Sequence, residues 1–95
     1  MKNKFNDNRL AEEFDLIVLT DNAHAKAGFP RGSLGTLIYS YTGKDTPLYA
    51  EFETGELTKE LALGLDGFRV LDIKQPCDLS IVTAYLKNRI SRNAQ

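Results

Sequence analysis

The stretch Leu48-Tyr49-Ala50-Glu51-Phe52-Glu53-Thr54 alternates apolar and polar side chains. Successive side chains of a β-strand point to opposite faces. The even positions are therefore expected to face a core, and the odd positions, which include two glutamates, to face water. Gly55 and Glu56 follow as a tight reversal. The pattern predicts a strand over residues 48–54 with one buried and one wet face.

Four further segments fit strands, because they are rich in apolar and β-branched residues or alternate, and turn-forming residues bound them. The segment after the reversal, residues 57–63, is too confined by glycines to be a helix of ordinary length. A long loop is expected over residues 21–33, which lack periodicity. The five expected strands are Phe14–Thr20, Gly35–Thr42, Leu48–Thr54, Leu57–Leu63 and Phe68–Ile73.

A helix is predicted after Pro76, over residues 78–92, with Asp78 as its N-cap. Apolar residues recur at three- and four-residue steps, so one stripe of this helix is expected to be buried. The stripe consists of Leu79, Val82, Leu86 and Ile90, widened by Ile81 and Tyr85. Together the elements predict a mainly β domain, a small five-stranded antiparallel SH3-like barrel with a C-terminal helix. It spans residues 14–95, after a polar N-terminal segment over residues 1–13.

Composition excludes several classes of protein. The chain has 95 residues, 42% of them hydrophobic and 26% charged, as expected for one soluble globular domain. A net charge of −1 supplies no long-range field toward phosphate backbones or anionic lipid. The apolar runs are too short to cross a bilayer, and no signal-peptide pattern follows Met1, so a cytoplasmic location is expected. Cys77 is the only cysteine, which rules out an internal disulfide and a thiolate zinc cluster.

Four segments resemble a family of short uncharacterised bacterial proteins, a domain of unknown function with an SH3-like barrel. In that family two glycines with two residues between them lead into a strand, as Gly32 and Gly35 do here. The same spacing is similar to the turn of KOW-type SH3-like domains. The resemblance implies a barrel and brings no catalytic residues. It rests on residues 14–19, 30–38, 48–52 and 68–71, whereas the long loop, Ala50 and the C-terminal helix depart from the family pattern. Physically, such glycines permit a positive φ or close backbone approach.

Side chains able to carry chemistry are few. His24, the only histidine, lies near Asp21 but has no nucleophile at a recognised spacing, so it is interpreted as a solvent-exposed loop residue. Cys77 is interpreted as a half-buried filler rather than a reactive thiol. No ligand set for a metal is present, and no cofactor is expected. The sequence therefore predicts a protein that is not an enzyme.

Acidic and aromatic residues supply the candidate binding surface. The acidic candidates are Glu51, Glu53 and Glu56, which form either a solvated strand face or a patch that docks on a basic partner. A carboxylate pair of the glycosidase type is a third interpretation. The aromatic candidates are Tyr39, Tyr41 and Tyr49, read as cross-strand packing pairs or as stacking platforms for bases.

The function expected from these observations is a non-enzymatic protein-binding module, similar to immunity or antitoxin proteins that cover a basic nuclease with an acidic surface. One alternative is a KOW-like nucleic-acid accessory domain. Its phosphate contacts would come from Arg31, Lys44, Arg69, Lys87, Arg89 and Arg92. The other alternative is a homo-oligomer that pairs through the helix stripe or a strand edge. No membrane partner is expected.

Overall fold

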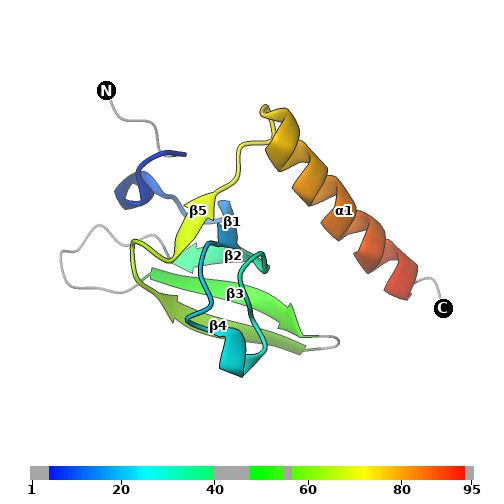
Figure 1. The fold of residues 1–95 in the computed structure, drawn as a ribbon, viewed down its shortest axis with the longest axis horizontal. Helices are drawn as coiled ribbons and strands as arrows, with labels where there is room; N and C mark the ends of the chain where they lie inside the picture. Colours follow the sequence, from blue (N-terminus) through cyan, green and yellow to red (C-terminus); the bar gives the residue numbers. More distant parts are fainter. Residues whose placement is uncertain (1–4, 40–47, 55–56, 94–95) are drawn as a thin grey trace.

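A computed structural model describes residues 5–39, 48–54 and 57–93, with the side chains of these residues except at positions 39, 54, 57 and 88–93. Within these ranges it contains five strands, one long helix and two short 3-10 turns, η1 and η2 (Figure 1). The elements in chain order are η1 (Asn8–Leu10), β1 (Leu16–Leu19), η2 (Ala25–Ala27), β2 (Leu34–Tyr39), β3 (Leu48–Thr54), β4 (Leu57–Leu63), β5 (Phe68–Val70) and α1 (Pro76–Asn93).

The strands form one antiparallel sheet in the order β4-β3-β2-β1-β5. Strands β1 to β4 follow one another as a meander, and β5 returns to the free edge of β1, where Val70 pairs with Ile17. This confirms a mainly β protein of five antiparallel strands with a C-terminal helix. Among the described residues, β4 pairs only with β3 and β5 pairs only with β1. No pairing between these residues joins the two edge strands, so closure of the sheet into the expected barrel is not confirmed.

Two strands begin and end where the sequence predicts. Every residue of β3 pairs with one of β4, from Leu48 opposite Leu63 to Thr54 opposite Leu57, as a tight hairpin requires. Strand β1 begins two residues later than predicted, because Phe14 has a left-handed backbone with φ 72° and is 72% exposed. Strand β5 ends at Val70 rather than Ile73. The predicted end of the second strand, residues 40–42, lies outside the described residues.

One face of the sheet carries the hydrophobic core, and we call it the inner face. The even positions of β3 are buried, whereas Tyr49 and Glu51 are half-buried and Glu53 is exposed, which confirms the predicted alternation. The long loop also supplies Phe29, whose ring centroid is 5.2 Å from that of Phe52. The core residues are Ala11, Ile17, Leu19, Phe29, Leu37, Leu48, Ala50, Phe52, Leu61, Leu63, Phe68 and Val70.

Gly32 and Gly35, the two glycines at the entry to β2, serve different purposes: one adopts a positive φ and the other allows close packing. Gly32 has a φ of 95°, a conformation that side-chain-bearing residues rarely adopt. Gly35 lies under the ring of Phe52, so a Cβ at this position would be 2.6 Å from Phe52 Cε2. Strand β2 therefore needs a glycine at position 35 for the core to close over it.

Helix α1 begins at Pro76, a position where the missing amide of proline costs nothing. The amide of Leu79 donates to the carbonyl of Gln75, so Asp78 lies in the first turn, and the prediction of Asp78 as the N-cap is wrong. The described part of the chain contains no helix with the length and apolar character of a membrane span.

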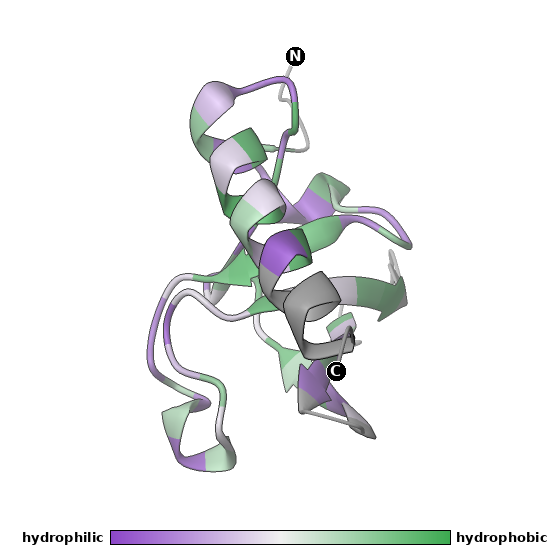
Figure 2. Ribbon diagram, turned by 90° about the vertical axis from the view of Figure 1, so that its right-hand side faces the viewer, coloured by the Kyte–Doolittle hydropathy of each residue, from purple (hydrophilic) through white to green (hydrophobic). Residues whose placement is uncertain are grey.

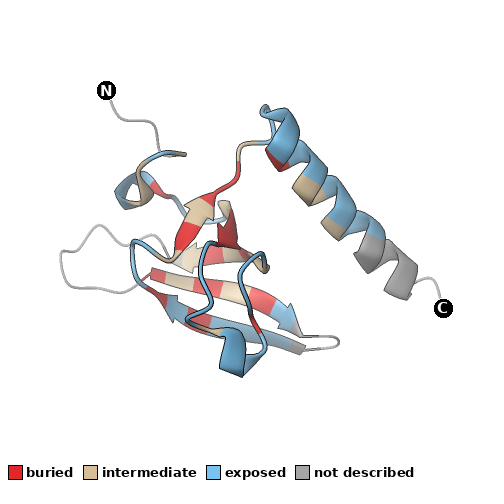
Figure 3. Ribbon diagram, viewed as in Figure 1, coloured by how far each residue is buried: buried red, intermediate tan, exposed pale blue. Residues whose placement is uncertain are grey.

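Figure 2 shows α1 in front of the sheet. The helix shares a groove with Leu16, Thr36 and Glu51, so it lies over the face opposite the core, which we call the outer face. Its side chains at Ile81, Val82 and Tyr85 are half-buried. Leu79 and Leu86, which were expected in the buried stripe, are 50% and 47% exposed. Figure 3 shows most of the described part of α1 in the colour of exposed residues. The helix therefore covers the outer face incompletely, because only one side of its apolar stripe reaches the sheet.

Candidate binding face

A single row of side chains crosses four strands of the outer face. The strand register places Leu16 opposite Thr36, Thr36 opposite Glu51, and Glu51 opposite Glu60. The row passes from an apolar residue on β1 to two carboxylates on β3 and β4. Glu53 lies two positions along β3 on the same face. The outer face is therefore apolar toward β1 and acidic toward β4.

Glu51 and Glu60 are like charges directly opposite each other on neighbouring strands. Such a pair brings Cβ atoms to about 5 Å and destabilises the sheet. Neither carboxylate forms a salt bridge with another residue that the structure describes. Lys59, the basic residue next to Glu60, pairs with Phe52 and so projects from the opposite side of the strand. Among the residues that the structure describes, no positive charge therefore offsets this pair.

The substitution Glu60→Lys is expected to raise the free energy of unfolding by about 0.2–1 kcal/mol, because it puts opposite charges across from each other. Urea unfolding of the variant and the wild type measures the change. Glu13→Lys is the matched control, since Glu13 is exposed outside the strands and no such gain is expected there. Equal stability changes for the two variants would show that the cross-strand repulsion is absent.

A groove runs between α1 and the outer face, with a volume of about 250 Å³. Its floor comes from β1, β2 and β3, and its wall from the second and third turns of α1. We call it the α1 groove. Its lining residues are Leu16, Leu34, Gly35, Thr36, Glu51, Glu53, Val82, Tyr85 and Leu86. The groove is smaller than the roughly 300–1,000 Å³ of small-molecule sites, and two carboxylates from the acidic side of the face line it.

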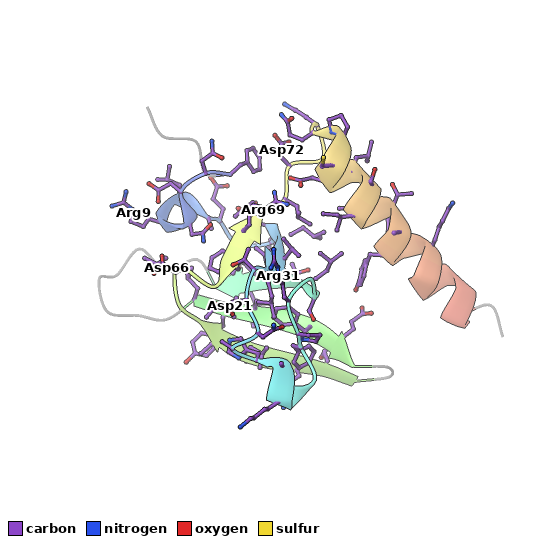
Figure 4. The ribbon with its side chains drawn as sticks, viewed as in Figure 1. Arg9, Asp21, Arg31, Asp66, Arg69 and Asp72 are labelled. Atoms are coloured by element: carbon purple, nitrogen blue, oxygen red, sulfur yellow. The ribbon has the colours of Figure 1, made fainter. Side chains whose placement is uncertain are left out.

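The start of α1 is fixed by an ion pair to β5. The two terminal nitrogens of Arg69 donate to the two carboxylate oxygens of Asp78 at 3.0 and 2.9 Å, and the amide of Asp72 donates to the same carboxylate at 2.8 Å. Asp78 is 4% exposed. Figure 4 shows Arg69 and Asp72 near the strand–helix junction. A bidentate guanidinium and a backbone amide together set the position of the helix over the sheet.

These hydrogen bonds make stability depend on pH. The hydrogen bonds from the guanidinium of Arg69, with help from the amide of Asp72, hold the pKa of Asp78 below its ordinary value. The contribution to stability is therefore complete above the unfolded-state pKa of about 3.9 and is lost as pH falls through the lower folded-state value. The stability difference between the wild type and Asp78→Asn is expected to shrink below about pH 4. Urea unfolding of both proteins across this range measures it, and a constant difference would contradict the assignment.

Of the candidate residues from the sequence, the structure brings three together. Tyr49, Glu51 and Glu53 share the outer face of β3. Glu56 and Tyr41 lie outside the described residues, as does the side chain of Tyr39.

To Glu51 and Glu53 the structure adds a third carboxylate, from Glu60, and the helix residues of the groove. The register of the hairpin could have identified Glu60 from the sequence, because a two-residue reversal at positions 55 and 56 places it opposite Glu51. The helix residues depend on how α1 sits over the sheet, for which the sequence has no local signal.

The structure also places the two residues that were considered for catalysis or metal binding, His24 and Cys77. His24 is half-buried at the N-cap position of η2, so the prediction of a solvent-exposed histidine is wrong, and its side chain makes no capping hydrogen bond. Cys77 is exposed in the first turn of α1, so the interpretation as a half-buried filler is wrong. Among the described residues no group of histidine, cysteine and carboxylate side chains could hold a metal ion.

A second, open hollow of about 490 Å³ lies between the N-terminal segment and the turn before β5. Asn8 closes one side by donating to the carbonyls of Leu65 and Phe68. The two arginines that line the hollow are already paired, Arg9 with Asp7 and Arg69 with Asp78. Paired guanidinium groups attract an anionic ligand weakly, so this hollow is a poorer candidate than the outer face.

Comparison with known proteins supplies no relative: no family model, no curated protein and no solved structure matches this chain.

Proposed function

We propose that this protein is a non-enzymatic binding module that recognises a basic segment of another protein through the outer face of β3 and β4. The observation that carries the proposal is the pair Glu51 and Glu60, two carboxylates opposite each other with no described cation between them. The repulsion between these carboxylates destabilises the free protein. A lysine or arginine of a partner that lies between them removes this repulsion. Neutralisation of a basic nuclease is one function of this type.

Tyr49 and Glu53 lie on the same face as Glu51. Tyr49 is half-buried two positions from Glu51, so its ring offers apolar area beside the charges. Glu53 lies two positions from Glu51 on the same face of β3. Tyrosine is one of the residue types enriched in protein–protein interfaces, so Tyr49 fits a surface that binds a protein.

The nucleic-acid alternative has less support. Arg69 is engaged by Asp78, and Lys44 together with the side chains of Arg89 and Arg92 lies outside the described residues. Arg31 and Lys87 are exposed, but Arg31 lies in the long loop and Lys87 in α1, so these two cations come from separate elements. Self-association through the helix stripe or a strand edge stays a prediction.

A display library of short random peptides tests the proposal. Peptides that the wild type enriches are expected to carry excess lysine and arginine. The double variant Glu51→Lys/Glu60→Lys should weaken their binding at least about tenfold, since it turns attraction into repulsion. The matched control is Glu13→Lys/Asp66→Lys, which changes the net charge by the same amount at exposed positions outside the outer face. Peptides without excess positive charge, or equal losses in the two variants, would contradict the proposal.

A further inference from the structure

The α1 groove adds an apolar component to the acidic face. Leu16 and Leu34 form part of its floor and are half-buried, and Leu86 on the wall is 47% exposed. These side chains retain contact area that neither the sheet nor the helix covers. Because burial of a leucine-sized side chain is strongly favourable, a groove of this kind binds an apolar group that fits it.

The charges beside the groove identify what kind of molecule brings that group. Glu51 and Glu53 line the groove together with the leucines. An apolar ligand without positive charge would place the carboxylate of Glu51 in a drier environment, which is costly because Glu51 has no salt-bridge partner among the residues that the structure describes. A segment that carries a lysine or arginine next to its apolar side chain avoids this cost. The chemistry of the lining therefore favours a basic segment with an apolar anchor.

We infer that the α1 groove takes one bulky aliphatic or aromatic side chain of the partner protein, next to a basic residue that meets Glu51. This inference rests on the proposed function and specifies the partner as a segment in which an apolar anchor is flanked by lysine or arginine. The groove volume of about 250 Å³ is suited to one or two side chains. The anchor contributes affinity, and the basic residue sets the position of the segment on the face.

Two fluorescent synthetic peptides test the inference by fluorescence anisotropy at low salt. They share their lysine positions and differ at the centre, where one has leucine and the other serine. The leucine peptide is expected to bind at least about tenfold more tightly to the wild type. Two helix variants locate the contact: Leu86→Asn removes a lining residue, and Leu79→Asn changes a leucine of similar exposure on the same helix outside the groove.

Leu86→Asn should weaken the leucine peptide about fivefold to tenfold and leave the serine peptide unchanged, while Leu79→Asn should change neither. Equal affinity of the wild type for the two peptides, or equal losses in the two helix variants, would overturn the inference. If the groove inference fails in this way but both peptides still lose affinity in the Glu51→Lys/Glu60→Lys variant, the proposed function of the acidic face is retained. Failure of both peptides to bind, or binding that ignores this charge reversal, would overturn the inference and the proposed function together.

Discussion

The substitution Gly35→Ala is expected to lower the free energy of unfolding by about 1–3 kcal/mol, the usual cost of overfilling a packed core. The added Cβ would lie 2.6, 2.8 and 2.9 Å from Cε2, Cζ and Cδ2 of Phe52. The ring cannot move away freely, because Phe52 is 1% exposed and packs against Phe29. Urea unfolding, read by circular dichroism, measures the loss.

Two further variants separate this clash from a general intolerance of alanine. Gly64→Ala is the control, since an added Cβ there has nothing within 4 Å, and a change within about 0.5 kcal/mol is expected. In a Phe52→Leu background the cost of Gly35→Ala should fall, because the smaller side chain leaves room for the methyl group. The same cost in both backgrounds would show that the ring of Phe52 does not lie over Gly35.

Asp78→Ala is expected to lower stability by about 2 kcal/mol and to loosen the start of α1. The change leaves the amide of Asp72 without its acceptor and Arg69 without its partner. The loss should be smaller than the 3–5 kcal/mol, roughly, of breaking a fully buried pair, because the Arg69 side chain is 43% exposed and water can hydrate it. Thermal unfolding gives the loss, and hydrogen exchange of the α1 amides reports the loosening.

A double-mutant cycle with Arg69→Leu isolates the ion pair. Asp78→Ala should cost less in the Arg69→Leu background than in the wild type, since the guanidinium is then already absent. Additive losses would mean that Asp78 acts through the amide of Asp72 alone. Full protection of the α1 amides in Asp78→Ala would contradict the role of this carboxylate in holding the helix.

The part of the fold that follows from local pattern could be predicted from the sequence. Strands β3 and β4 have the predicted bounds, because their alternation and the reversal between them act within one hairpin. The loop before β2 was also expected, as were the two uses of its glycines. Strand β1 is shorter than predicted because Phe14 takes a left-handed conformation, although its apolar side chain favours a strand.

What the sequence could not supply comes from contacts between distant segments. Asp78 has the residue type and position of an N-cap, but Arg69 and the amide of Asp72 bind its carboxylate and the helix starts at Pro76 instead. The exposure of Leu79 and Leu86 depends on the position of α1 over the sheet, which helical periodicity does not specify. The same holds for the groove that Leu86 lines, whereas the acidic residues of β3 were identified by alternation.

The central claim is that the acidic outer face, with the α1 groove beside it, is the surface that binds a partner. Amide chemical-shift mapping of the isotope-labelled protein, titrated with a peptide enriched from the library, tests it most directly. The account predicts that the largest shift changes fall on β3 and β4 around Glu51 and Glu60 and on α1 around Val82 and Leu86. Changes concentrated instead in the loop over residues 20–33, or around the hollow beside Asn8, would contradict it.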